Sequence, residues 1–67
     1  MNYVIFDSTA NMVDSFDREE EARATLAEII EREPNTAEDY VIATINDSGH
    51  IVATISGASV VDAEQYA

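Results

Sequence analysis

The chain contains 67 residues, of which 14 are Asp or Glu and three are Arg, and its formal net charge is −11. A chain this short forms one domain around one small core, so we expect a single domain over residues 1–67, and the lack of cysteine excludes a disulfide or a thiolate metal site. The charge opposes direct binding to nucleic acid, while the short apolar runs and the lack of a basic, apolar leader predict a cytoplasmic protein without a membrane span.

Two short apolar segments at the amino end predict a β-hairpin. Residues 1–6 are rich in β-branched and aromatic side chains, and residues 12–16 form a second, shorter apolar stretch. Between them, the side chains of residues 7–11 compete for backbone hydrogen bonds and favour a turn.

A helix is expected next, from Arg18 to about Arg32. Asp17 is a good N-cap, and Glu20 stands three residues later, where it can complete a capping box. Pro34 should end the helix, because proline lacks an amide hydrogen and pushes the preceding residue out of helical geometry. The apolar residues of the segment recur at helical spacing and should form one buried stripe: Ala22, Leu26, Ile29 and Ile30.

After a connecting turn over residues 35–39, the alternating segments 40–46 and 51–56 flank a turn at 47–49 and predict a second hairpin. The order ββαββ predicts an α+β fold with one helix on a four-stranded, mainly antiparallel sheet. A short C-terminal helix capped by Ser59, with Asp62 three residues later, completes the expected fold. The other sheet face stays open, with Ile42, Val52 and Thr54 expected on it, which leaves both a monomer and a homodimer open.

The sequence carries no signature of a catalytic, cofactor or metal site. His50 is the only histidine, and the chain offers no cysteine, lysine or second histidine to pair with it. The turn at Asp47 lacks the alternating acids and terminal glutamate of a calcium loop. We therefore expect a non-enzymatic protein.

The carboxylates of the predicted helix follow a pattern of their own. At 3.6 residues per turn, acids occupy the side opposite Leu26, whereas Arg23 and Arg32 lie nearer the edges, each four residues after a glutamate with which it can pair. The result would be a ridge of carboxylates about 21 Å long. The candidate partner-binding residues are this ridge and nearby acids: Asp14, Asp17, Glu20, Glu21, Glu28, Glu31 and Asp47.

Two other interpretations of the acidity remain open. A charged helix face is usually only solvated, and acidic excess without lysine is typical of a protein kept soluble in the salt-loaded cytoplasm of a halophile. In both cases the charge says nothing about a partner. The contact surface would then be the hydrophobic sheet face, as in an antitoxin or a small regulatory or structural domain.

Over residues 3–56 the chain resembles small bacterial hairpin-helix-hairpin proteins of unassigned function. The resemblance lies in the segments YVIFD at 3–7, SFDREEEA at 15–22 and YVIA at 40–43. In size, charge and lack of catalytic residues, the whole chain also resembles phage-encoded anti-CRISPR proteins, several of which imitate DNA at a basic surface of the CRISPR effector. This resemblance implies an inhibitor that binds a basic nucleic-acid-binding protein, a CRISPR effector subunit or alternatively a toxin, in the host cytoplasm if phage-encoded.

Overall fold

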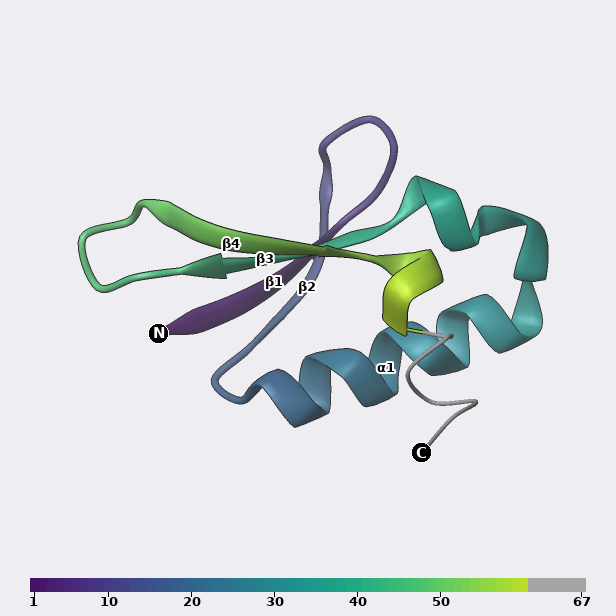
Figure 1. The fold of residues 1–67 in the computed structure, drawn as a ribbon, viewed down its shortest axis with the longest axis horizontal. Helices are drawn as coiled ribbons and strands as arrows, with labels where there is room; N and C mark the ends of the chain where they lie inside the picture. The colour runs from purple at the N-terminus through teal and green to yellow at the C-terminus, as the bar shows by residue number, and fades with distance from the viewer. Residues whose placement is uncertain (61–67) are drawn as a thin grey trace.

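The computed structural model describes residues 1–60 of the chain. Its elements are β1 (Asn2–Phe6), β2 (Met12–Phe16), α1 (Glu19–Arg32), a 3-10 helix η1 (Pro34–Asp39), β3 (Val41–Ile45) and β4 (Ile51–Ser56). A further helical turn covers residues 57–60. The strands form one antiparallel four-stranded sheet in the order β2-β1-β3-β4, and α1 runs along one side of it (Figure 1). The expected α+β fold is confirmed, with both hairpins where the sequence placed them.

The register of the strands decides which residues face α1. Ile5 pairs with Ile42 on β3, and Ile42 pairs with Ile55 on β4. Directly opposed residues in an antiparallel pair share a face of the sheet, so these three isoleucines form one row. Ile5 and Ile42 are fully buried and belong to the core, which means that this row lies on the side covered by α1.

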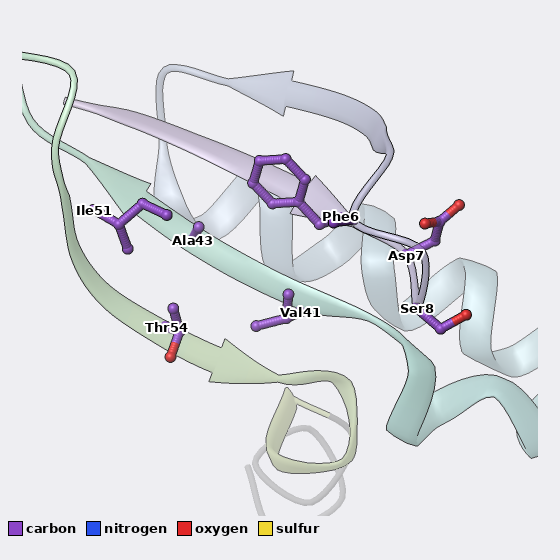
Figure 2. A pocket seen from close by; sticks show the side chains of 8 residues that line it. Phe6, Asp7, Ser8, Val41, Ala43, Ile51 and Thr54 are labelled. Carbon is purple, nitrogen blue, oxygen red and sulfur yellow. The ribbon is translucent and has the colours of Figure 1, made fainter.

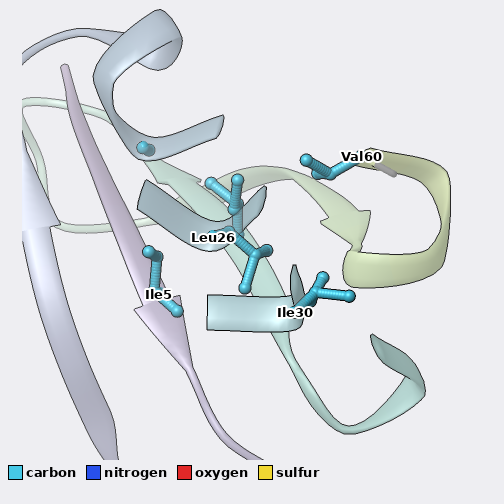
Figure 3. Close-up of a cluster of buried hydrophobic side chains, with 6 residues drawn as sticks. Ile5, Leu26, Ile30 and Val60 are labelled. Atoms are coloured by element: carbon cyan, nitrogen blue, oxygen red, sulfur yellow. The ribbon is translucent and has the colours of Figure 1, made fainter. Parts of the chain in front are cut away.

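The core lies between this sheet face and α1 (Figure 3). It consists of six buried side chains: Ile5, Ala22, Leu26, Ile30, Ile42 and Val60. The predicted helical stripe is confirmed, because three of its four members are buried and Ile29 packs against the cluster. Burying one large aliphatic side chain stabilises the fold by about 1.5 to 3 kcal/mol, so a core of this size leaves little stability to spare.

The start of α1 differs from the predicted capping box. The N-cap is Arg18, with extended backbone angles (φ −125°, ψ 136°) and no side-chain capping hydrogen bond. Asp17 therefore lies outside the helix, and Glu20 lies in its first turn. Phe16 pairs with Tyr3 as the last residue of β2, so the chain needs the next two residues to turn toward the helix. The helix therefore begins only at Glu19. Three successive glutamates in the first turn then interact favourably with the helix dipole.

The end of α1 and the following connection are close to the expectation. The helix stops at Arg32, and Pro34 opens η1, where a 3-10 helix takes the place of the simple turn expected over residues 35–39. Proline suits this position because the first amides of a helix have no intrahelical acceptor. The segment leads directly into β3.

The last helical turn has a different cap from the expected one. The Ser56 hydroxyl oxygen accepts the backbone N–H of Ser59 at 3.2 Å, which is the geometry of an N-cap bonding to the third residue of a helix. Ser56, the last residue of β4, is thus the cap, and Ser59 lies inside the turn. Asp62, the other residue of that prediction, lies outside the described residues. The turn matters for the core because it delivers Val60 against Leu26 and Ile30.

The prediction for the open sheet face is wrong at Ile42. Its side chain is fully buried under α1, and the neighbouring set of β3, with Val41 and Ala43, occupies the open face instead. Both alternating sets of β3 are uncharged and contain isoleucine, so the alternation itself does not indicate which one faces the helix.

Candidate functional site

The acidic face of α1 consists of Glu20, Glu21, Glu28 and Glu31. All four side chains are exposed, because Leu26 on the opposite side of the helix is fully buried. From Glu20 to Glu31 the helix rises about 16 Å at 1.5 Å per residue. One DNA strand places about five phosphates over that distance, so four carboxylates approach the linear charge density of a single strand.

Two of the three arginines lie beside the first turn of α1. Arg23 contacts Glu19 at 3.4 Å, as its spacing predicts, and Arg18 contacts Glu20 at 3.5 Å, which partly neutralises one end of the acidic face. Exposed pairs of this kind stabilise by at most about 1 kcal/mol. The pair expected between Glu28 and Arg32 does not form. Within residues 1–60, no basic group lies within ion-pair distance of Glu21, Glu28 or Glu31.

The other three predicted site residues lie at different distances from this face. Asp14 is opposite Ile5 on β2 and is exposed, so it lies on the α1 side of the sheet. Asp17 is exposed just before the helix and extends the acidic face at its N-terminal end. Asp47 lies in the β3–β4 turn, which projects away from α1 at the left of Figure 1, and its carboxylate is 3.5 Å from the terminal ammonium of Met1. The structure therefore separates Asp47 from the acidic face.

The open face of the sheet has the opposite character to the acidic face of α1. None of its strand residues is charged: Asn2, Val4, Phe6, Met12, Ser15, Val41, Ala43, Ile45, Ile51, Thr54 and Ser56. In a chain where 25% of residues are charged, this neutrality distinguishes the face from the rest of the surface. Met12 and Ile51 remain 65% and 59% exposed on it.

A shallow hollow of about 300 Å³ lies on this open face. Phe6, Val41, Ala43 and Ile51 line it, and the loop that begins at Asp7 forms one rim (Figure 2). The apolar lining can accommodate an apolar side chain, but it offers no converging polar groups with which to orient a small molecule. The sequence alone does not single out this face, because β1, β3 and β4 contain no charged residue on either face and β2 contains only Asp14.

Asp7 has a structural role in the loop that follows β1. It accepts the Thr9 hydroxyl at 2.7 Å and the backbone N–H groups of Thr9 and Asn11 at 2.9 and 3.0 Å. The bond from the Thr9 side chain, followed by that from the Asn11 backbone, lowers the pKa of Asp7 below its ordinary value. Bonds to its own loop hold this carboxylate, so it shapes the β1–β2 turn rather than acting as an acid or base.

We predict that the melting temperature rises when sodium chloride is increased from about 0.05 M to about 1 M. Added salt shortens the Debye length from about 10 Å at about 0.1 M to about 3 Å at about 1 M, which screens repulsion among the unpaired glutamates. Thermal denaturation followed by circular dichroism measures the change. A melting temperature that stays constant or falls would mean that the carboxylates are compensated in the folded state.

Neither α1 nor the shorter helices of the described part of the chain are long and apolar enough to cross a membrane. Within residues 1–60, no three His, Asp or Glu side chains come together in a way that could hold a metal ion.

The described surface offers two candidate sites for a partner, the acidic face of α1 and the neutral open face of the sheet. Comparison with protein families, with curated proteins and with solved structures finds no match to this chain.

Proposed function

We propose that this protein is a non-enzymatic inhibitor that presents the acidic face of α1 to a basic nucleic-acid-binding protein. In this proposal the partner is a CRISPR effector, and the inhibitor occupies a groove that otherwise holds DNA. The observation that carries the proposal is the row of exposed glutamates on one side of a helix whose other side is anchored in the core. A rigid support fixes the spacing of the charges before binding, which reduces the entropic cost of association.

The charge pattern also supports an electrostatic mode of binding. Arg18 and Arg23 pair near the first turn of α1, while Glu21, Glu28 and Glu31 remain available to cations from outside. Complementary charge mainly accelerates association and selects the partner. The complex should therefore compete with DNA for the same surface and weaken as salt is raised.

The neutral open face favours a second candidate, an antitoxin or small regulatory domain that binds through the sheet. Apolar contact with a partner would place Met12 and Ile51, both largely exposed, in the interface. In that case α1 would face solvent in the complex, and its charge would serve solubility alone. Substitutions confined to α1 separate this function from the first.

The deciding variant replaces Glu20, Glu21, Glu28 and Glu31 by lysine. Each substitution replaces one negative charge by one positive charge, so the formal net charge changes from −11 to −3, and the buried stripe of α1 is untouched. Glu20 and Glu21 lie in the first turn of α1, where lysine interacts unfavourably with the helix dipole by about 0.3 to 1 kcal/mol each. Glu28 and Glu31 are ordinary surface positions, where a substitution changes stability by about 0.5 kcal/mol or less. We expect folding to survive, which circular dichroism of the variant checks. Inhibition of DNA binding by CRISPR effector complexes, measured by electrophoretic mobility shift, should be lost.

A matched control carries the same four charge reversals on other exposed acids, at Glu33, Glu38, Asp39 and Asp47. Its net charge is also −3, so it reports the effect of total charge without altering the acidic face of α1. We expect it to inhibit much like the unmodified protein. Equal loss of inhibition in both variants would show that only the net charge matters. Full inhibition by the α1 variant would contradict the proposal and would indicate that the partner contacts the open sheet face.

A further inference from the structure

The two edges of the sheet differ in how they are protected against pairing with another strand. β2 forms one edge and β4 the other. β2 carries the exposed carboxylate of Asp14 and leads into the charged start of α1. β4, with the sequence IVATIS, has no charge and no proline, and five of its six residues are exposed. Charged residues, prolines and β-bulges are the usual means of blocking an edge strand. β4 has no charge and no proline, and its one irregularity lies at Val52, where the register to β3 shifts, so residues 53–56 remain regular.

The hydrogen-bond pattern shows which backbone groups of β4 face outward. The Gly57 N–H donates to the Tyr40 carbonyl at 2.8 Å, which marks these opposed residues as a hydrogen-bonded pair. Such pairs recur at every second residue of an antiparallel ladder, so Ile55 and Ala53 direct their backbone groups toward β3. The N–H groups of Thr54 and Ser56 and the C=O of Thr54 consequently point to the outer edge, where no strand of the described chain meets them. The C=O of Ser56 instead serves the last helical turn, for which Ser56 is the N-cap.

We propose that β4 pairs with β4 of a second copy of this chain, forming a homodimer with a continuous eight-stranded sheet. In an antiparallel pair, directly opposed residues share a face of the sheet. When the two strands are identical and related by a two-fold axis, one residue at the axis must therefore lie directly opposite the same residue of the second copy. Thr54 is that residue, because its outward groups can exchange two hydrogen bonds with Thr54 of the second copy. Ser56 of each copy then faces the irregular position Val52 of the other copy, so the regular part of the contact is centred on Thr54.

Charge makes a second copy a suitable occupant despite the net charge of −11. α1 packs against β1 and β2, two to three strand positions away from β4. At about 4.8 Å per strand, the two helices of the dimer lie about 25 to 30 Å apart, well beyond the Debye length of about 8 Å at physiological ionic strength. Pairing therefore brings together two neutral strands and keeps the acidic faces apart.

The same contrast between edges limits the assembly to two chains. Once the β4 edges are joined, only the β2 edges remain, and their exposed Asp14 carboxylates oppose further pairing. The contact is isologous and closed. A single strand pair buries little surface, which places the dimer among weak, concentration-dependent complexes.

Sedimentation equilibrium over protein concentrations up to about 1 mM tests the dimer. We expect the apparent mass to rise from 7.3 kDa toward twice that value. Thr54→Pro removes one outward N–H from each copy and leaves the ladder to β3 intact, so it should raise the dimer dissociation constant about tenfold or more. Thr54→Val keeps both the β-branched shape and the N–H and should dimerise like the unmodified chain.

Amide hydrogen exchange on the unmodified protein provides a second measurement that needs no variant. The amides of Thr54 and Ser56 should exchange more slowly as the protein concentration rises, whereas those of Ala53 and Ile55 should be protected at all concentrations because they bond to β3. A 7.3 kDa mass at every concentration would overturn the proposal. Dimerisation of Thr54→Pro with unchanged affinity would overturn it too, and would place the contact on the open sheet face.

Discussion

Leu26→Ala should lower the free energy of unfolding by about 2 to 5 kcal/mol. The Leu26 side chain is fully buried between α1 and the sheet, as one of only six buried residues of the core. Removing it leaves a cavity that the surrounding side chains can fill only in part. A domain of this length has a total stability of about 3 to 10 kcal/mol, so one substitution removes a large share. Urea denaturation followed by circular dichroism measures the loss.

Glu28→Ala is the matched control, because it also introduces alanine into α1 but on the exposed side. Alanine has the higher helix propensity, and the substitution removes one of the crowded negative charges. We therefore expect a change within about 0.5 kcal/mol, as for an ordinary surface position. Similar losses in the two variants would mean that the acidic face of α1 is not the solvent-exposed side.

The helix and the hairpins could be predicted because local chemistry specifies them. The stripe containing Ala22 and Leu26 follows the helical period, and Pro34 is incompatible with continuing the helix. The turns between paired strands also depend on nearby residues. The Asp7 carboxylate accepts hydrogen bonds from the backbone N–H groups of Thr9 and Asn11, and these bonds close the first turn. Short-range features of this kind are encoded within a few residues of one another.

The identity of the open sheet face could not be predicted, because it depends on contacts that form only in the folded protein. Val41 and Ala43 alternate with Ile42 and Thr44, and either set could pack on a helix. Ile42 is buried because it lies between Ile5 and Ile55 in the register. A one-residue shift of β3 would expose it, and no feature of the segment alone excludes that shift.

The candidate site was predictable only where it lies on a single element. The sides of α1 follow directly from helical periodicity, so Glu21, Glu28 and Glu31 are exposed as expected. Asp47 belongs to a turn whose position depends on the whole sheet, and the structure separates it from α1. The neutral edge of β4 required the strand order, since the sequence does not reveal which strands are central.

Gly57 is the second position at which we expect a large loss of stability. It is buried where β4 passes into the last helical turn, and its N–H donates to the Tyr40 carbonyl. A Cβ added here would overlap the backbone oxygen of Ala37 in η1 and would lie 3.0 Å from the Ile30 Cδ1 atom. The side chain of Ile30 can move, but the backbone of η1 is held between α1 and β3.

Gly57→Ala should therefore cost about 3 kcal/mol, at the upper end of overpacking effects. Gly49→Ala is the control: Gly49 has nothing within 4 Å of an added Cβ, but its φ of +84° is left-handed, so we expect a cost of about 1 to 2 kcal/mol. Adding Ile30→Val to Gly57→Ala shortens the movable neighbour and leaves the clash with Ala37. The double variant should recover no stability in urea denaturation, and recovery would show that Ile30, rather than η1, requires glycine at this position.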